Sequence, residues 1–294
     1  MDNPSSRTAI LGTGLFGLVG STFVEAFADK YDCTNLDLLS GVDITDETQV
    51  MKAAEASAAD AIIHCAAFVD VNRAWEEKGN KNGLTYKVNV LGTQNIVNAA
   101  AKFHKHVIHI STAYVFDGEK DSMYVEDDAI HPVEWYGETK AMAEEVVKNG
   151  GASWTILRID QPFRKTAFGK KADSARKIIQ GLQSGKLYPQ FVDHWFAPTY
   201  LDDFAQVLDW AVQKKPNGIY HATVNQKVTD FEFAQKLSTA LSLPAEIKEG
   251  HLADYLKTLQ RPYQRNTALS SEKLFKESGL KLHTLDEAVS SIVI

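Results

Sequence analysis

This chain of 294 residues has little cysteine, no long apolar run and no basic cluster. Its two cysteines, Cys33 and Cys65, lie in unrelated segments without metal-ligand spacing, which argues against a disulfide framework and a metal site. No stretch reaches the ~18 apolar residues of a membrane span, and residues 1–7 contain no apolar leader. We therefore expect a protein of the reducing cytoplasm that has no membrane partner.

The charge balance excludes another class of partner. The formal net charge is −7, and the positive side chains do not gather in one segment. A nucleic-acid partner is therefore not expected. The composition, 44% hydrophobic and 23% charged, is that of a globular protein whose length allows one large α/β unit or two domains.

The first informative segment is glycine-rich. Residues 8–11 form a short apolar run, the motif GTGLFG follows over residues 12–17, and residues 18–27 have a helical pattern. Strand, glycine turn and helix in this order are typical of a dinucleotide site, although the motif alone also fits an ordinary turn. We expect Gly12 to permit the tight turn, Gly14 to let the backbone approach a pyrophosphate, and Gly17 to allow close packing of the helix.

Apolar strands then alternate with helical segments. Strands are expected at residues 34–38, 60–67, 106–110 and 153–158, with helices at 48–57, 89–102 and 138–148 between them. This alternation predicts an α/β fold with a doubly wound parallel sheet. We expect a dinucleotide-binding Rossmann domain over residues 1–158 and a smaller, mainly substrate-binding lobe over residues 159–294. Short segments at about residues 200–222, including a helix at 202–213 and a strand at 218–221, are expected to return to the first domain.

A tyrosine and a lysine stand four residues apart in the helix expected near residue 138. Tyr136 and Lys140 therefore share one helix face. A phenol has an ordinary pKa near ~10, and an adjacent cation brings that pKa closer to neutrality. The pair predicts acid–base chemistry. The alternative is a packed aromatic ring beside a solvated lysine.

Several segments of the chain resemble those of a known family. Residues 109–118, HISTAYVFDG, resemble the S-T-D-Y-V-F-x-G signature of dTDP-4-dehydrorhamnose reductases, which belong to the extended short-chain dehydrogenase/reductase superfamily. The resemblance runs nearly the whole chain. Further matching segments are residues 66–71, 88–93, 124–140, 197–203, 218–221 and 261–262.

The resemblance implies transfer of a hydride from NADH or NADPH to the C4 ketone of a nucleotide-linked deoxysugar. It makes Tyr136 the general acid, Lys140 the group that lowers the Tyr136 pKa and binds the nicotinamide ribose, and Thr112 the donor to the carbonyl oxygen. No metal is implied. The expected cofactor contacts are Gly12, Gly14, Leu15, Phe16, Gly17, Asp37, Asp43, Ile44, Cys65, Ala66, Ala67, Asn89, Ser111, Tyr136 and Lys140. The expected substrate contacts are Val69, Thr112, Ala113, Asp160, Gln161 and Arg261.

Two of these assignments have alternatives. Asp37 closes the second expected strand, where a carboxylate accepts a bond from the ribose 2′-OH and repels a 2′-phosphate, which favours NAD over NADP. Family members differ in this preference, so both cofactors stay open. Asn89 is either a helix N-cap or a residue that positions Lys140 through water.

The departures from the family pattern fall on the substrate side. Gln161 stands where the family has a tryptophan that packs on the sugar, and Ala113 replaces the aspartate of the signature. The identity of the sugar is therefore open. Nearby cations are expected to suit a nucleotide diphosphate, with a solvated surface as the alternative. They are Arg158, Arg164, Lys165, Lys170 and Lys171.

Three functions stay open at this stage. The first is a reductase of a 4-keto nucleotide sugar, and the second is a reductase or epimerase that uses the same residues on another nucleotide sugar. The third is a non-catalytic, cofactor-binding regulatory subunit like that of methionine adenosyltransferase, which resembles the same family. Related proteins are often dimers, so a homodimer is possible in each case.

Overall fold

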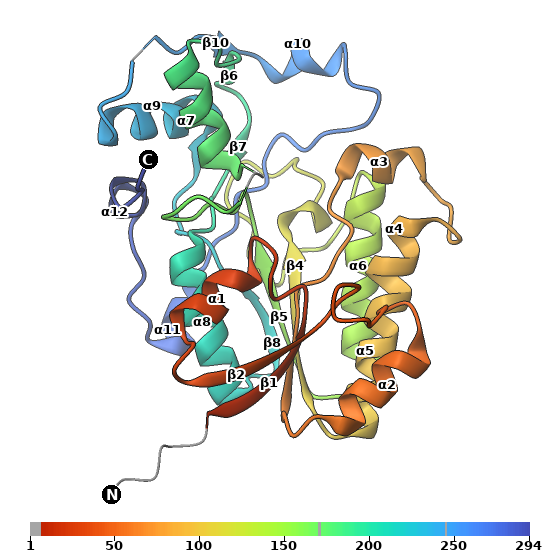
Figure 1. Ribbon diagram of the computed structural model, residues 1–294. Helices are drawn as coiled ribbons and strands as arrows, with labels where there is room; N and C mark the ends of the chain where they lie inside the picture. The colour runs from red at the N-terminus through yellow and green to blue at the C-terminus, as the bar shows by residue number, and fades with distance from the viewer. Residues whose placement is uncertain (1–6, 170–171, 245) are drawn as a thin grey trace, which may run out of the picture.

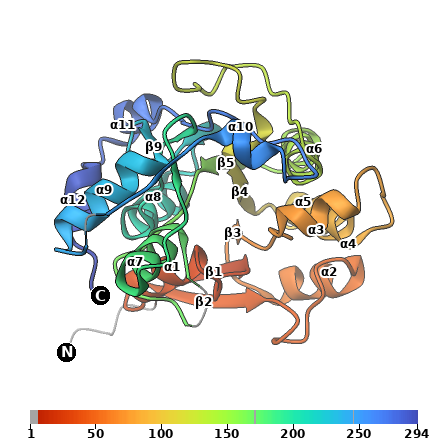
Figure 2. The same ribbon diagram turned by 90° about the horizontal axis from the view of Figure 1, so that it is seen from above.

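The computed structural model describes residues 7–169, 172–244 and 246–294, and a parallel sheet with helices on both faces forms its centre (Figures 1 and 2). The strand order is β2-β1-β3-β4-β5-β8, and every neighbouring pair in this sheet is parallel. The strands are β1 (Thr8–Thr13), β2 (Tyr31–Leu36), β3 (Ala61–His64), β4 (His106–Thr112), β5 (Trp154–Ile159) and β8 (Gly218–His221). The predicted doubly wound α/β fold is confirmed.

Two apolar layers hold the helices against this sheet. One face carries α1 (Gly20–Ala26), α8 (Leu201–Lys214) and α11 (Glu272–Ser278), whose Phe23, Phe204 and Leu274 share one buried cluster. The opposite face carries α2 (Glu47–Ala56), α5 (Thr93–Lys102) and α6 (Trp135–Asn149) (Figure 2). Strands β3 and β4 are buried along their whole length, which fits their high content of apolar residues.

A smaller lobe lies over the carboxyl ends of the strands (Figure 1). Its core is a separate buried cluster that includes Phe163, Phe196 and Phe233. The lobe consists of α7 (Ser174–Ser184), α9 (Asp230–Ala240), α10 (Leu252–Leu256), α12 (Leu285–Ser290) and the two-residue strands β6 (Gln190–Phe191), β7 (Trp195–Phe196), β9 (Val228–Thr229) and β10 (Glu249–Gly250).

The chain between the elements of the lobe returns to the sheet. Helix α8 packs against α1, and β8 pairs with β5 at the edge of the sheet. Helix α11, later in the chain, also packs on β8. The division of the chain at residues 158 and 159 into two functional domains stays a prediction.

Several element boundaries differ from those expected. Strand β2 ends at Leu36 rather than 38, because Asp37 and Ser40 bond each other in a turn. Helix α7 was not predicted, although Asp173 caps its first turn and Gly185 ends it in the left-handed conformation. Four short elements complete the fold, namely α3 (Val71–Glu76), α4 (Leu84–Tyr86), the π-helical turn η1 (Lys87–Gly92) and the 3₁₀ turn η2 (Ala113–Val115).

Candidate active site

The glycine turn lies where the order of the strands reverses. From β1 the chain goes first to β2 on one side and then crosses to β3 on the other, so a crevice opens between the carboxyl ends of β1 and β3. Gly14 has φ +62°, and a Cβ there would lie 2.8 Å from the backbone nitrogen of Ala66. Only glycine fits here, because the turn after β1 packs directly against the backbone after β3.

The expected roles of the other two glycines need correction. Gly12 lies inside β1, and a Cβ there would meet the Leu15 side chain at 2.6 Å, so this glycine allows close packing rather than the turn. A Cβ on Gly17 would meet only the Gly14 carbonyl, at 3.2 Å. The close approach expected at Gly17 occurs at Gly20, where a Cβ would lie 2.6 Å from the Cα of Leu15.

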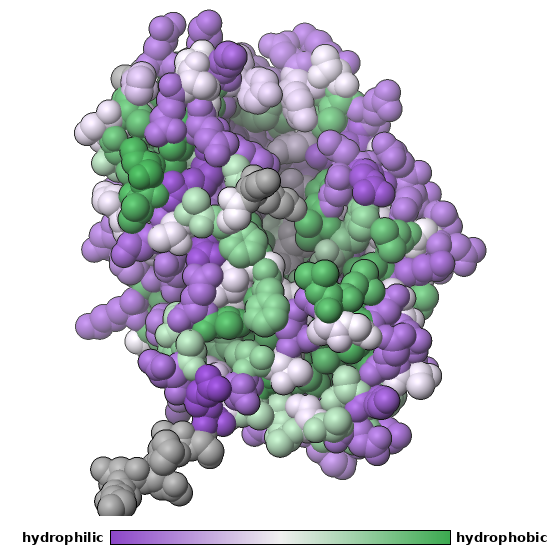
Figure 3. All heavy atoms as spheres, in the orientation of Figure 1, coloured by the Kyte–Doolittle hydropathy of each residue, from purple (hydrophilic) through white to green (hydrophobic). Residues whose placement is uncertain are grey.

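Exposed apolar side chains surround the crevice. Phe16 after β1 is 58% exposed, Leu38 and Leu39 after β2 are exposed, and Val69 follows β3. The surface is hollowed between the lobe and the sheet (Figure 3). Apolar surface at the carboxyl edge of an open sheet is typical of a ligand site.

The remaining predicted cofactor contacts on this side are placed as follows. Asp37 follows β2 and accepts bonds from the Asn35 amide at 2.5 Å and the Ser40 backbone N–H at 2.8 Å. Asp43 is bound to Thr45, whereas Leu15 and Ile44 are buried in the two apolar layers. Cys65, Ala66 and Ala67 follow β3 and are partly exposed.

Helix α6 presents the predicted general acid. Glu134 caps this helix, and its two carboxylate oxygens accept bonds from the backbone N–H groups of Tyr136 at 2.8 Å and Gly137 at 2.7 Å. Thr112 ends β4, and its side chain lies near that of Tyr136, whose pKa it lowers. The structure thus brings together two residues that are separated by a long loop in the sequence.

The pKa of Tyr136 differs from the expectation. Burial raises it above the ordinary value, the charge of Glu134 raises it further, and only the Thr112 side chain lowers it. Lys140 does not lower this pKa, because its ammonium group points elsewhere. Its Nζ donates to the carbonyl oxygen of Ile110 at 2.7 Å and contacts Nε2 of His109 at 3.1 Å. Tyr136 therefore keeps its proton at neutral pH.

Lys140 is itself buried, and this burial lowers its pKa to about 8, against an opposing effect of Glu144. His109 is buried in β4 with its pKa held well below the ordinary value by burial and by Lys140. A neutral imidazole is a suitable acceptor for the lysine ammonium group. His64 and His221 are likewise buried strand residues.

Asn89 does not cap a helix, so that alternative is wrong. It lies inside η1, and its amide accepts a bond from the Phe68 N–H at 2.7 Å and donates to the Thr139 hydroxyl at 3.0 Å. It thereby ties the loop after β3 to α6, one residue before Lys140. The positioning of Lys140 by Asn89 through water stays a prediction.

A buried ion pair lies behind the predicted catalytic residues. Arg158 on β5 donates to Glu144 on α6 through Nε at 2.9 Å and Nη2 at 2.7 Å. Ser111 donates to the same carboxylate at 2.6 Å, so its hydroxyl is engaged inside the protein. The expectation that Arg158 suits a diphosphate is therefore wrong, because its charge is neutralised and its side chain is buried.

The other cations expected near a diphosphate differ in burial. Arg164 is also buried, and it is bound to Ser21 at 2.9 Å and Glu25 at 2.5 Å on α1, so it holds the lobe to the sheet. Lys165 is exposed. Lys170 and Lys171 lie outside the described residues.

The predicted substrate contacts do not all reach a surface. Ala113 is fully buried against Phe116, so its methyl group does not line the cleft, contrary to expectation. Val69 is exposed, and Arg261 donates to the Asn72 side chain at 2.9 Å. Asp160 and Gln161 follow β5, and Gln161 has φ +38°, a conformation that non-glycine residues rarely adopt.

Tyrosines near the site were missed from the sequence. The ring of Tyr114 meets that of Tyr136 edge to face, with centroids 5.8 Å apart, and a hydrogen bond joins Tyr114 to Tyr263 of the lobe. Burial raises the pKa of both Tyr114 and Tyr263. The position of Tyr114, two residues after Thr112, was an available signal, whereas Tyr263 is brought here only by the fold.

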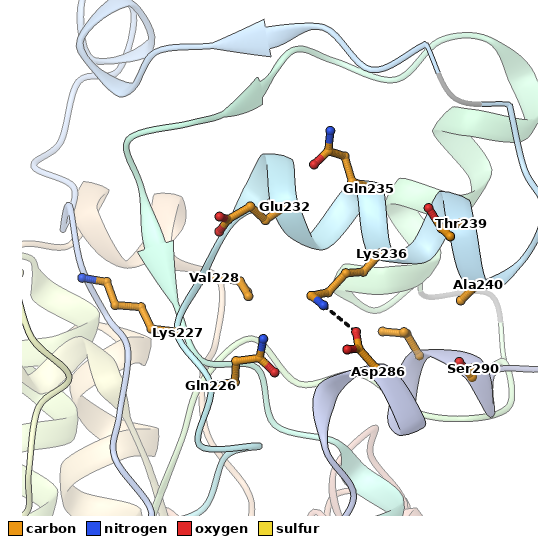
Figure 4. A pocket seen from close by; sticks show the side chains of 11 residues that line it. Gln226, Lys227, Val228, Glu232, Gln235, Lys236, Thr239, Ala240, Asp286 and Ser290 are labelled. Carbon is orange, nitrogen blue, oxygen red and sulfur yellow. Dashed lines mark hydrogen bonds and ion pairs between the residues drawn. The ribbon is translucent and has the colours of Figure 1, made fainter.

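Tyr263 also lines a pocket of about 690 Å³ in the lobe. Its other lining residues are mainly aromatic and acidic, and they include Tyr188, Phe191, Tyr255, Asp230 and Glu249. A second pocket of about 510 Å³ lies between α9 and α12, beside the ion pair of Lys236 and Asp286 (Figure 4). None of the predicted site residues lines this second pocket.

Neither a metal-ligand cluster nor a membrane-spanning helix occurs in the described ranges. Residues 7–169, 172–244 and 246–294 contain no group of three or more His, Cys, Asp or Glu side chains placed to hold a metal ion. No helix in these same ranges is long and apolar enough to cross a membrane.

Comparisons with known proteins agree with this fold. The chain is 29% identical over 301 residues to a dTDP-4-dehydrorhamnose reductase of Aggregatibacter actinomycetemcomitans, covering 96% of this chain and 97% of that protein. It is 28% identical over 295 residues to methionine adenosyltransferase 2 subunit beta of Xenopus laevis, covering 93% and 83%. The crystal structure of dTDP-4-dehydrorhamnose reductase from Bacillus anthracis in complex with NADP has a TM-score of 0.87 at 22% identity, covering 96% and 97%.

The family model described as the RmlD substrate binding domain matches residues 8–294, nearly the whole chain. This chain therefore belongs to that family, as its resemblance to the dTDP-4-dehydrorhamnose reductases predicted.

Proposed function

We propose that this protein is an NAD(P)H-dependent reductase of a 4-keto deoxysugar linked to a nucleotide, similar to dTDP-4-dehydro-L-rhamnose. The observation that carries the proposal is the pairing of Thr112 with Tyr136 at the carboxyl end of β4, with Lys140 one turn further along α6. Thr112 ends a strand of the sheet that carries the glycine turn, and Tyr136 and Lys140 lie on a helix that packs against this strand. The family membership supports the same chemistry.

When bound, the cofactor supplies the hydride. Tyr136 gives its phenolic proton to the ketone oxygen as that oxygen becomes an alcohol. Tyr136 is protonated at neutral pH, as a general acid must be, but its raised pKa makes it a weaker proton donor than a phenol with a pKa near neutrality. Thr112 donates a hydrogen bond toward the same oxygen, so that the developing charge meets a fixed donor.

Lys140 lies one turn after Tyr136 on α6. With a pKa of about 8 it is mostly protonated at neutral pH, but its charge does not lower the Tyr136 pKa in this arrangement. Its ammonium group is also the donor we assign to the nicotinamide ribose. Asn89 keeps this part of α6 in place through Thr139.

Binding of the dinucleotide is assigned to the crevice between β1 and β3. Gly14, Phe16, Ala66 and Ala67 form its walls, and Asp37 stands at the end of β2, where the adenosine ribose of a Rossmann protein lies. The carboxylate of Asp37 favours NAD over NADP. On the substrate side we assign Val69, Gln161 and Arg261 to the cleft.

The test is oxidation of NADH and of NADPH with dTDP-4-dehydro-L-rhamnose, followed by absorbance of the reduced nicotinamide. Tyr136→Phe removes the proton donor and is expected to abolish most turnover while leaving dinucleotide affinity unchanged. Near-normal turnover in this variant contradicts the proposed mechanism. Tyr86→Phe is the matched control, because Tyr86 stacks on Trp135 of the same helix and has no assigned role in the chemistry.

The same experiment separates the alternative functions. Turnover only with a different nucleotide sugar supports a reductase or epimerase of that sugar. Dinucleotide binding without turnover of any 4-keto sugar supports a regulatory subunit, which the similarity to methionine adenosyltransferase 2 subunit beta keeps as the second candidate. The homodimer stays a prediction from the resemblance.

A further inference from the structure

Asp160 stands beside the proposed reaction centre. It is the first residue after β5, and the register pairs Ile159 of β5 with Thr112 of β4. Adjacent strands lie ~4.8 Å apart, so the backbone of Asp160 runs next to that of Ala113 at the same edge of the sheet.

The backbone of Asp160 is fixed on both sides. Its N–H donates to the Thr199 hydroxyl at 3.1 Å, and its carbonyl oxygen accepts from the Thr199 N–H at 2.7 Å. The next residue, Gln161, is held in the left-handed region at φ +38°. The side chain of Asp160 therefore has little freedom to reach a different partner.

The two oxygens of this carboxylate differ in their hydrogen-bond partners. Oδ2 accepts bonds from the Thr267 hydroxyl at 2.8 Å and the Ala197 N–H at 3.3 Å. Oδ1 is buried and has no hydrogen-bond partner within the described residues, in a residue that is only 2% exposed. A buried acceptor without a donor costs about 1–3 kcal/mol, and more when it is charged.

The groups that face Asp160 do not remove this cost. Tyr114 on η2 and His194 before β7 lie near it, and Asp230 at the start of α9 adds a like charge. None of them donates to Oδ1 in the described part of the chain. Burial is the main reason that the pKa of Asp160 is raised to about 7. An asparagine would serve Thr267 and Ala197 equally well, so the second oxygen has no use inside the protein.

We propose that Oδ1 of Asp160 accepts a hydrogen bond from a hydroxyl or amino group on the sugar ring, which makes Asp160 a specificity-determining residue. The inference rests on the proposed function, because the sugar must lie between Asp160 and the Thr112–Tyr136 pair. It adds the chemical class of the group that is recognised, a hydrogen-bond donor on the ring. A deoxy position would leave the oxygen unpaired and is selected against.

The test compares two ligands of one protein. We would titrate the NADP⁺-saturated protein with dTDP-L-rhamnose and with dTDP by calorimetry, because the difference between their Kd values isolates the sugar. In Asp160→Asn the amide oxygen faces Thr267 and Ala197, so the NH₂ group replaces the free acceptor. We expect Kd for dTDP-L-rhamnose to rise about 10- to 100-fold, as for a lost bond to a charged group. Kd for dTDP should stay within about twofold.

Asp173→Asn is the matched control. Asp173 is another buried carboxylate near the lobe, but both of its oxygens accept backbone N–H bonds, from Arg176 and Arg164. This variant should leave the difference between the two ligands unchanged. Thermal unfolding of both variants checks that they are folded.

The outcomes separate this inference from the proposed function. Equal weakening of both ligands by Asp160→Asn, or no weakening of either, overturns the role of Asp160. Failure of both ligands to bind the wild type overturns it as well. If binding of dTDP-L-rhamnose depends on Asp160 but the 4-keto sugar is not reduced, the inference stands and the proposed reaction fails.

Discussion

Replacement of Arg158 by methionine is the most direct test of the packing behind the site. The side chains of Arg158 and Glu144 are 2% and 0% exposed, and two hydrogen bonds of 2.7 and 2.9 Å join them. Methionine fills most of the arginine volume but leaves the Glu144 carboxylate in the interior with only the Ser111 hydroxyl at 2.6 Å. Breaking a buried pair from one side costs about 3–5 kcal/mol.

This loss should be plain in urea-induced unfolding followed by circular dichroism. Domains have unfolding free energies of roughly 5–15 kcal/mol, so Arg158→Met removes a large fraction of the total. The double variant Arg158→Met, Glu144→Leu leaves no unpaired charge and should recover most of the loss. The surface pair Lys215–Asp60 provides the control, since Lys215→Met should change the free energy of unfolding by less than about 1 kcal/mol.

Either of two outcomes would refute the prediction for Arg158→Met. A loss below about 1 kcal/mol in Arg158→Met would mean that Glu144 is neutral or hydrated in solution. A double variant that is as unstable as the sum of both single variants would mean that the side chains do not act as a pair.

The remaining predictions concern the site itself. Gly14→Ala should lower dinucleotide affinity at least tenfold, measured by fluorescence titration, because its Cβ would lie 2.8 Å from Ala66. Thr112→Val should lower kcat by roughly 10²- to 10³-fold, as for loss of one oxyanion donor, and an unchanged kcat removes Thr112 from the mechanism. Asp37→Ala should lower the ratio of kcat/KM with NADH to kcat/KM with NADPH. An unchanged ratio excludes Asp37 from cofactor selection. The folded-state pKa of Asp160 is raised to about 7, so its contribution to the free energy of unfolding is present below pH ~4 and is lost as the pH rises to ~7. The loss amounts to up to ~4 kcal/mol. In urea unfolding, Asp160→Asn should therefore be more stable than the wild type at pH 8 but not at pH 4.

Most of the sheet was predictable because its strands are buried on both faces. The run at residues 106–110 is buried throughout although it contains two histidines, and β4 covers it with two further residues. The edge strand β2 was placed too late, because its exposed Asp32 and Thr34 hide the apolar pattern. Helix α7 lay in a segment of mixed composition, and its cap residues went unrecognised.

The candidate site likewise contains residues that could be predicted from the sequence and residues that could not. Tyr136, Lys140 and Thr112 were identified from local motifs, and the topology alone brings Thr112 to Tyr136. The fate of Arg158 was not predictable, because its partner Glu144 lies on another element and only the fold brings the two together. The direction of the Tyr136 pKa was wrong for the same reason, since burial and Glu134 outweigh the local spacing of a lysine.

The return of α8, β8 and α11 to the sheet has a consequence for how the chain folds during synthesis. Residues 7–159 end with β5 as an unpaired edge, and the face of the sheet beside α1 lacks the apolar side chains of α8. The last strand of the sheet, β8, is made only at residues 218–221, and α11, which packs on β8, follows at residues 272–278. We therefore expect residues 7–159 not to fold on their own, and a fragment that stops at residue 159 should aggregate rather than bind a dinucleotide.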